Sequence, residues 1–220
     1  MKKKIKLKKI LIILGIVVAI FLLFFGYTKL HIKNIYVEGN NILSEGEIIE
    51  WLDLYDYPEI YKVMQSDMRG KLLKHDLVKE ASVKVSLFGK VRIKIIENDI
   101  LYSENNNYML SNGKIISLDK KIVVPTLINE VDNAVLDKFI NKMTLISKDI
   151  LIKISEIEYI PSELDNERFM FYMDDGNYVY ITLSKMSAIN NYNEIYKTLE
   201  GNKGILYLDS GNHFEIKKPK

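Results

Sequence analysis

The side chains that could do catalytic or metal-binding chemistry are few and lie far apart in the sequence. The three histidines are His31, His75 and His213, and their separation does not favour a metal site or a catalytic triad. We expect His75 to close a helix, where a cationic side chain suits the helix dipole. Cysteine is absent, which excludes thiol chemistry, thiolate metal sites, disulfides and lipidation through cysteine.

The acidic and hydroxyl motifs have structural explanations that involve no chemistry. Asp174-Asp175-Gly176-Asn177 resembles part of a calcium loop but lacks the downstream glutamate, so we expect a hairpin turn. Ser44 has no nucleophile motif around it and is expected to cap a helix, and Asp53 and Asp56 are expected at a solvated helix end. The sequence therefore predicts no catalytic residue, no metal site and no cofactor, and we expect that the protein is not an enzyme.

A long apolar segment near the N-terminus is the first feature that carries function. Residues Ile10–Thr28 contain no charged side chain, and as a helix they would be about 28 Å long, close to the thickness of a bilayer core. A cleaved signal peptide is the alternative, but the apolar run is longer than usual for one and no small-x-small cleavage site follows Tyr27. We therefore expect an uncleaved transmembrane helix over residues 10–30.

Charge predicts the orientation of this helix. The chain carries 31 basic and 29 acidic side chains, and six of the basic ones are lysines within the first nine residues. The positive-inside rule places residues 1–9 in the cytoplasm as a basic tail and the domains after the span outside the cell. Nucleic-acid binding by this tail is not expected, because the lysines directly precede the span and have no aromatic residues among them. The six residues are Lys2, Lys3, Lys4, Lys6, Lys8 and Lys9.

Residues 31–97 read as a small β-α-α-β-β domain. A strand over residues 35–37 precedes the turn Gly39-Asn40-Asn41, and Ser44-Glu45-Gly46-Glu47 fits a capping box. The first helix should bury residues as far as Tyr55 and end before Pro58, and a looser second helix should run from Ile60 towards residue 75. Two strands with alternating apolar residues, 83–87 and 91–95, complete a three-stranded sheet with both helices on one face.

Residues 98–216 read as a strand-rich α+β domain, followed by a short tail over residues 217–220. Asn112-Gly113 predicts a two-residue hairpin turn, and a helix over about 135–146 should be capped by Asp132 or Asn133. A second helix is expected over residues 186–199. Strands are expected over residues 157–160, 168–173, 178–183, 205–208 and 214–216.

The order of these elements, with several short motifs, resembles the FtsQ/DivIB family of bacterial cell-division proteins, whose first extracellular unit is a POTRA domain. Two departures are Phe88-Gly89, where the family usually has a proline, and Asn98 after Glu97, where it usually has a basic residue. The motifs are Ile32-x-x-Ile35-x-Val37-x-Gly39-Asn40, Leu77-Val78-x-x-Ala81-x-Val83, Val91-x-Ile93-x-Ile95-x-Glu97, Leu110–Ile116, Val124-Pro125-Thr126-Leu127 and Tyr207-Leu208-Asp209 before His213-Phe214.

This resemblance implies a non-catalytic scaffold of the divisome, held in the cell membrane by one span and enriched at the division septum. It would bind FtsB/DivIC-like and FtsL-like bitopic proteins through the edge of the second domain's sheet, and no nucleic acid or small-molecule substrate. The partner-binding residues would be Ile205, Leu206, Tyr207, Leu208, Asp209 and Phe214, with Tyr178 and Tyr180 beside them. Leu206 and Leu208 could instead face the core, so we expect most from the aromatic pair Tyr207 and Phe214.

The resemblance also places a recruitment surface on the POTRA domain, formed by Glu38, Gly39, Asn40 and Asn41. Two other functions stay open. A POTRA-type chaperone for exported polypeptides would need several tandem units or a barrel, and the sequence has room for one unit and no barrel pattern. A signal-anchored cell-wall hydrolase would need an active site, and no residues of this sequence form a recognisable one.

Overall fold

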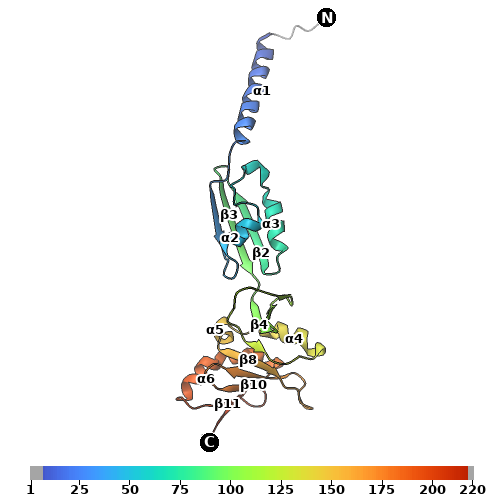
Figure 1. Ribbon diagram of the computed structural model, residues 1–220, viewed down its shortest axis with the longest axis vertical. Helices are drawn as coiled ribbons and strands as arrows, with labels where there is room; N and C mark the ends of the chain where they lie inside the picture. The colour runs from blue at the N-terminus through green and yellow to red at the C-terminus, as the bar shows by residue number, and fades with distance from the viewer. Residues whose placement is uncertain (1–6, 218–220) are drawn as a thin grey trace. The chain divides into compact units, whose positions relative to one another are not determined.

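The computed structural model describes residues 7–217. Residues 1–6, with four of the six lysines of the expected basic tail, and residues 218–220 lie outside the described part. The chain separates into two compact units at the boundary between Glu97 and Asn98, and Figure 1 shows the elements of each. The first unit consists of an N-terminal helix and the first domain, and the second unit is the second domain.

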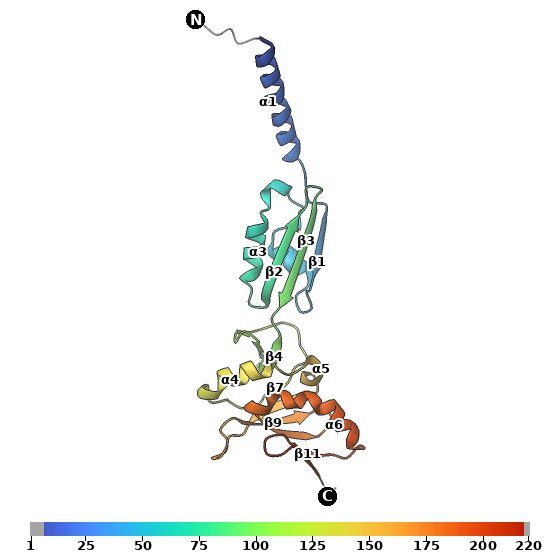
Figure 2. The same ribbon diagram turned by 180° about the vertical axis from the view of Figure 1, so that it is seen from behind.

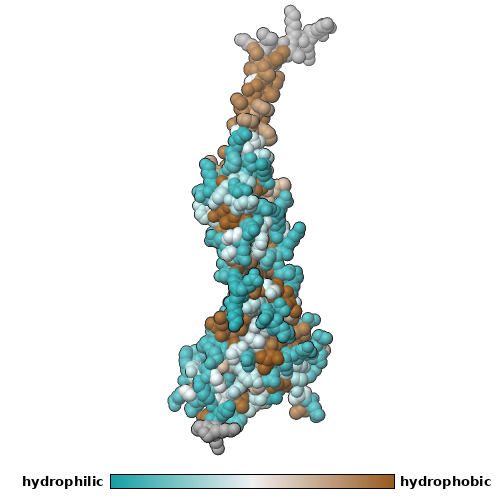
Figure 3. Space-filling model, viewed as in Figure 1, coloured by the Kyte–Doolittle hydropathy of each residue, from teal (hydrophilic) through white to brown (hydrophobic). Residues whose placement is uncertain are grey.

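The N-terminal helix α1 spans Leu7–Tyr27. Within residues 7–217 it is the one helix long and apolar enough to cross a membrane, over Lys9–Tyr27. Its large apolar side chains are exposed in the isolated chain, and they form the continuous brown surface of the helix in Figure 3. A helix that exposes apolar groups on all sides fits a lipid environment better than water. The expected apolar helix is therefore present and begins three residues before Ile10.

The first domain is a three-stranded sheet with its helices packed on one side. Its elements are β1 (Asn34–Glu38), α2 (Glu45–Trp51), the 3-10 helix η1 (Ile60–Lys62), α3 (Gln65–Leu73), β2 (Val78–Val85) and β3 (Lys90–Glu97). The strand order is β1-β3-β2, with β1 parallel and β2 antiparallel to the central β3. Alternation along β3 buries Val91, Ile93 and Ile95 almost completely, and α3 lies alongside β2 (Figure 2).

The helices of this domain differ in detail from the sequence prediction. The capping box is confirmed, because Ser44 and Glu47 bond to each other's backbone N–H groups. The prediction that Tyr55 continues the apolar face is wrong: α2 ends at Trp51, the backbone reverses at Asp53 with φ 56°, and Leu54 enters the core while Tyr55 is exposed. The expected second helix is interrupted between η1 and α3.

His75 does not act as a cation at a helix end. Its ring stacks on Trp51 with centroids 4.1 Å apart, and its Nδ1 accepts a hydrogen bond from the backbone N–H of Leu77 at 3.3 Å. Burial lowers the pKa of His75 below its ordinary value, against the opposing charges of Asp76 and Glu47. An Nδ1 that accepts a hydrogen bond carries no proton, so the folded domain favours the neutral ring.

The second domain is built on one mixed sheet with the strand order β12-β11-β10-β9-β8-β7-β4-β5-β6. Its strands are β4 (Ile100–Glu104), β5 (Asn107–Leu110), β6 (Ile115–Ile116), β7 (Thr126–Leu127), β8 (Ile154–Tyr159), β9 (Arg168–Met173), β10 (Tyr178–Thr182), β11 (Gly204–Tyr207) and β12 (His213–Ile216). Its helices are α4 (Asn133–Met143), α5 (Lys148–Leu151), the 3-10 helix η2 (Leu183–Asn191) and α6 (Tyr192–Thr198). Residues of all four helices share one core with the inner face of the sheet.

Local signals in this domain are mostly confirmed. Asp132 caps α4 through the N–H of Ala134, and residues 174–177 form the turn between β9 and β10. The two-residue turn at Asn112-Gly113 is wrong: the Leu110 N–H donates to the Lys114 carbonyl at 2.9 Å, so the loop has three residues, 111–113, and among them only Gly113 has a positive φ. The expected helix over 186–199 is a 3-10 helix followed by α6. The buried residues Leu183, Met186 and Ile189 recur every three positions, which matches the 3-10 period.

Candidate protein-binding edge of the second domain

At the end of the large sheet that the last strands form, the edge strand is β12, not β11. β11 pairs with β10 in parallel and with β12 in antiparallel orientation, so both of its sides are occupied. The expectation that Ile205, Leu206, Tyr207 and Leu208 form the free edge is therefore wrong, because the edge lies one strand further on, at β12. Strand order is a long-range property that the alternation of a single strand does not contain, and the free backbone groups belong to the strand of Phe214.

The backbone of β12 presents outward groups at alternate positions. The N–H of Lys217 donates to the carbonyl of Lys203 at 2.8 Å, and this pair continues the register in which Ile205 faces Glu215. Hydrogen-bonded pairs alternate along antiparallel strands, so the N–H and C=O groups of Phe214 and Ile216 point away from β11. Together they form an unpaired edge that another extended chain could extend.

An apolar groove lies beside this edge on the inner side of the strands. It has a volume of about 180 Å³ and runs between η2, α6 and the last two strands. Leu206 and Leu208 are buried in the core, and the half-buried Phe214 packs against it. The groove is lined by Ala188, Ile195, Leu199, Leu206, Leu208 and Phe214 together with three polar residues. The arrangement can take an apolar side chain from a segment that pairs with β12.

The outer face of the same strands carries a row of stacked rings. Tyr207 is half-buried, with its ring between Tyr180 at 5.3 Å and His213 at 4.6 Å. Tyr178 packs edge-on against Tyr172 at 5.4 Å. Tyr207 is thus less available than an exposed hot-spot aromatic would be, and much of its contact is with neighbouring rings of its own sheet.

Asp209 holds the end of β11 in place through a charged pair. Arg168 Nε donates to the Asp209 carboxylate at 2.7 Å, and the Arg168 guanidinium lies 4.1 Å from the centre of the Tyr180 ring. Burial alone would raise the pKa of the Asp209 carboxyl, but the hydrogen bonds from Arg168 and Ser210 lower it below its ordinary value. The sequence prediction missed Arg168, because 41 positions separate it from Asp209 and no local pattern links them.

Gly204 and Asn177 determine how closely the last two strands pair and what they are bonded to. A Cβ on Gly204 would overlap the carbonyl oxygen of Glu215 and would lie 2.8 Å from the Phe214 ring, so β12 can pair closely only because residue 204 is glycine. Asn177 is buried; its side chain accepts the Gly204 N–H at 2.9 Å and donates to the Tyr192 hydroxyl at 3.0 Å. The edge strands are therefore tied to the β9–β10 turn and to α6.

The predicted recruitment surface of the first domain is a rigid loop. Gly39 has φ +86°, and a Cβ there would overlap the carbonyl oxygen of Ile95. The Asn40 side chain donates to the carbonyl of Leu43 at 3.0 Å. The Glu97 carboxylate accepts the backbone N–H groups of Asn41, Ile42 and Leu43 at 2.8–3.1 Å. We call this arrangement the Glu97 clasp, and it leaves Glu38 and Asn41 exposed.

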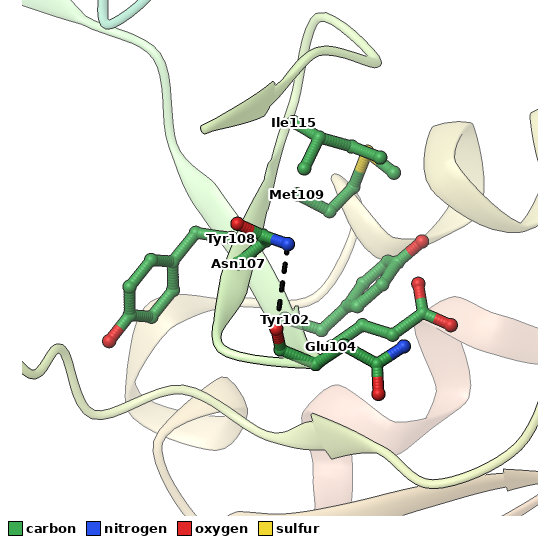
Figure 4. A pocket seen from close by; sticks show the side chains of 7 residues that line it. Tyr102, Glu104, Asn107, Tyr108, Met109 and Ile115 are labelled. Atoms are coloured by element: carbon green, nitrogen blue, oxygen red, sulfur yellow. Dashed lines mark hydrogen bonds between the residues drawn. The ribbon is translucent and has the colours of Figure 1, made fainter. Parts of the chain in front are cut away.

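A pocket of about 190 Å³ in the second domain has the wrong composition for catalysis by carboxylates. It lies beside β4 and β5, and Figure 4 shows the Tyr102 ring directed to the same side as the Glu104 carboxylate. Glu104 is the one acidic residue in its lining, and residues 7–217 contain no group of three potential metal ligands. The Tyr102 hydroxyl is buried without a hydrogen-bond partner, and burial raises its pKa.

Comparisons with known proteins now fit this architecture. Residues 30–98 match the family model described as "POTRA domain, FtsQ-type". The chain is 28% identical to the "Cell division protein DivIB" of Bacillus subtilis (strain 168) over 193 aligned positions, which cover 84% of this chain and 73% of the relative. It is 26% identical to the protein of the same name from Listeria monocytogenes, with 97% and 85% of the two chains covered.

Among solved structures, the major extracytoplasmic domain of DivIB from Geobacillus stearothermophilus aligns with a TM-score of 0.39 at 20% identity. The alignment covers 47% of this chain and 95% of that one. By its fold and its family match, the first domain is an FtsQ-type POTRA domain. Proteins named DivIB match most of its length, so the whole chain is similar to the FtsQ/DivIB family, as the motif order predicts.

Proposed function

We propose that the protein is a non-catalytic scaffold of the cell-division machinery and that β12 accepts an extended segment of a partner. The observation that carries this proposal is an unpaired strand, with outward N–H and C=O groups at Phe214 and Ile216, next to an apolar groove. Strand addition of this kind takes its affinity from backbone hydrogen bonds and its specificity from side-chain pockets. The names of the relatives supply the cellular process.

The proposed partners are small bitopic division proteins of the FtsB/DivIC and FtsL kinds. The support is the resemblance to the family, together with an anchoring helix that would hold the edge near the same membrane as such partners. Two proteins confined to one membrane meet at a raised effective concentration, so a short strand could suffice. Phe214 stays in the proposed site, with Tyr178, Tyr180, Tyr207 and Asp209 as supports of the edge.

The proposed topology has residues 1–9 in the cytoplasm and both domains outside, with enrichment at the septum. The support is the count of six lysines before the uncharged run that begins at Ile10, against Lys29 and Lys33 just after it. Protease added to intact protoplasts should digest the two domains. Domains that become digestible only after lysis would invert the topology.

The POTRA loop Glu38–Asn41 is proposed as a second contact surface, used for recruitment to the septum. Its support is the combination of exposed polar side chains with a backbone fixed by the Glu97 clasp, which presents them in one geometry. A Glu38→Lys variant should lower septal fluorescence of a tagged chain and leave capture of the β12 partner unchanged. Undiminished septal fluorescence would remove Glu38 from the surface.

The β12 proposal is tested by removing an outward backbone N–H group of β12 while leaving the side chains of the core unchanged. The full chain in detergent should capture a bitopic partner of the FtsB/DivIC kind from a membrane extract. Ile216→Pro removes an outward N–H without touching a bond to β11, and proline is tolerated at such edges. It should abolish capture, whereas the matched variant Ile216→Ala, which keeps the N–H, should largely retain it. Equal capture by both variants would contradict strand pairing.

The chaperone and hydrolase alternatives have less support. The POTRA match covers the single region 30–98, whereas a chaperone of this type needs tandem units. A hydrolase needs an acid and a base or a nucleophile in one pocket, and the pocket at Tyr102 brings one carboxylate. Turnover of cell-wall material by the purified chain would overturn the non-catalytic assignment.

A further inference from the structure

The tip of the β2–β3 hairpin exposes two large apolar side chains that the core does not use. Leu87 is 65% exposed and Phe88 is 82% exposed, more than any other aromatic side chain in residues 7–217. Lys84 and Lys90 flank this pair and are also exposed. Exposed apolar side chains placed side by side mark a surface that meets either another protein or a membrane.

The hairpin tip is bonded to the segment that leads from α1 into the domain. The Gly89 carbonyl accepts the N–H groups of Lys33 at 2.7 Å and Asn34 at 3.2 Å. Gly89 has φ +81°, and a Cβ there would lie 2.5 Å from the carbonyl oxygen of His31. The close contact requires glycine at this position, so the tip is fixed against residues 31–34.

That segment follows the apolar helix without a flexible linker. The N–H of Leu30 donates to the carbonyl of Tyr27 at 3.1 Å, and the carbonyl of Leu30 accepts the N–H of Ile60 at 2.8 Å. His31 forms a β-bridge with Glu59. Four residue steps separate Tyr27 from His31, which even fully extended span only about 14 Å. The hairpin tip therefore lies within short reach of the end of α1.

The side chains around this segment suit the boundary between lipid headgroups and acyl chains. Tyr57 and Tyr61, beside the segment bonded to Leu30, are each 47% exposed. Lys29 and Lys33, which flank residues 30–32 in the sequence, are also exposed. Aromatic rings with a polar end and basic side chains are the residues that gather at membrane interfaces, where the bases meet anionic headgroups.

We propose that Leu87 and Phe88 insert into the headgroup boundary of the outer leaflet and dock the POTRA domain on the bilayer. The occupant of this apolar tip is then the lipid of the membrane that α1 crosses, with Lys33, Lys84 and Lys90 directed to anionic headgroups. This inference rests on the membrane anchoring of the proposed function. Docking would set the height of the POTRA domain above the membrane independently of any partner.

The test measures the depth of tryptophan probes in proteoliposomes of phosphatidylglycerol and phosphatidylcholine with brominated acyl chains. The full chain carries one tryptophan, so Trp51→Phe gives a background without tryptophan fluorescence. Phe88→Trp reports on the tip. Lys79→Trp is the matched control at the far end of β2, about 20 Å from the hairpin at 3.3 Å per residue. Phe24→Trp reports on insertion of α1.

We expect brominated lipid to quench Phe88→Trp several-fold more than Lys79→Trp, and to quench Phe24→Trp strongly. Quenching of Phe24→Trp with equal, weak quenching of the other two probes would overturn the docking proposal and leave the anchoring intact. The tip would then be a surface for a protein. An unquenched Phe24→Trp would overturn the anchoring and the docking together. Because Phe88 is mostly exposed, its replacement leaves the core of the domain untouched.

Discussion

The two domains use their aromatic residues in opposite ways. The buried side chains of the first domain are aliphatic or methionine, and its tyrosines and Phe88 lie at the surface. The second domain buries six of its rings in the core between the sheet and the helices: Tyr102, Phe139, Tyr159, Phe169, Phe171 and Tyr192. A thin three-stranded layer is filled by branched aliphatic side chains, whereas the larger sheet uses the greater area of rings. Exposed aromatic residues in the first domain are thus available for binding.

The largest expected change in the free energy of unfolding comes from a substitution in the aromatic core of the second domain. Phe169 is fully buried, and its ring stacks on Phe139 at 4.5 Å. Phe169→Ala should lower the free energy of unfolding by about 3–5 kcal/mol, whereas Phe88→Ala at the exposed tip should change it by less than about 0.5 kcal/mol in detergent. Urea titration followed by circular dichroism measures both. Similar losses at the two positions would contradict the contrast between the domains.

A smaller effect is expected from the Glu97 clasp, which supports the first domain where aromatic packing is missing. Glu97→Gln keeps the shape of the side chain but removes the charge that strengthens three backbone hydrogen bonds. The unfolding free energy of the first domain should fall by about 1–3 kcal/mol, measured by Trp51 fluorescence in urea. Glu80→Gln, at an exposed position of β2, is the control. A loss no larger than that of the control would show that the charge is unimportant.

Tyr102 and Tyr192 both lie in the aromatic core of the second domain, but their hydroxyl groups differ in hydrogen bonding. The Tyr102 hydroxyl is buried without a partner, whereas the Tyr192 hydroxyl donates to Asp175 at 2.7 Å and accepts from Asn177 at 3.0 Å. Tyr102→Phe should raise the unfolding free energy by about 1 kcal/mol, and Tyr192→Phe should lower it by about the same amount. Thermal unfolding of the two variants tests the opposite signs. A loss at Tyr102→Phe would mean that its hydroxyl has a bonding role.

The pH dependence of the first domain should follow His75. Burial lowers the pKa of His75 in the folded domain, so below the unfolded value of about 6.5 the unfolded chain binds more protons. The contribution of neutral His75 to the free energy of unfolding is complete above the unfolded pKa. It is lost as the pH falls from the unfolded pKa through the lower folded pKa. The urea midpoint reported by Trp51 fluorescence should therefore drop between pH 7.5 and pH 5.5. His75→Gln should flatten this drop, and an unchanged drop in the variant would assign it to other groups.

The sequence predicts features that depend on near neighbours and misses those that depend on distant ones. The Ser44 capping box, the Asp132 cap and the turn at residues 174–177 each form within a few positions. The fold class and the β-α-α-β-β order also follow from hydrophobic periodicity. The Arg168–Asp209 pair joins residues 41 positions apart, and the Glu97 clasp joins residues 54–56 positions apart. The free sheet edge lies one strand beyond the predicted one for the same reason, since pairing of β10 with β11 joins strands that two helices separate in the sequence.

The buried side chain of Asn177 has a consequence for the order of folding. Gly204 finds the acceptor for its N–H only after the β9–β10 turn has placed Asn177, so β11 and β12 should join a hairpin that already exists. Parallel pairing across a long connection is a slow step compared with local hairpin closure. The strand pair should then assemble after the β9–β10 hairpin and open before it in native-state hydrogen exchange, so a partner that pairs with β12 would slow that opening.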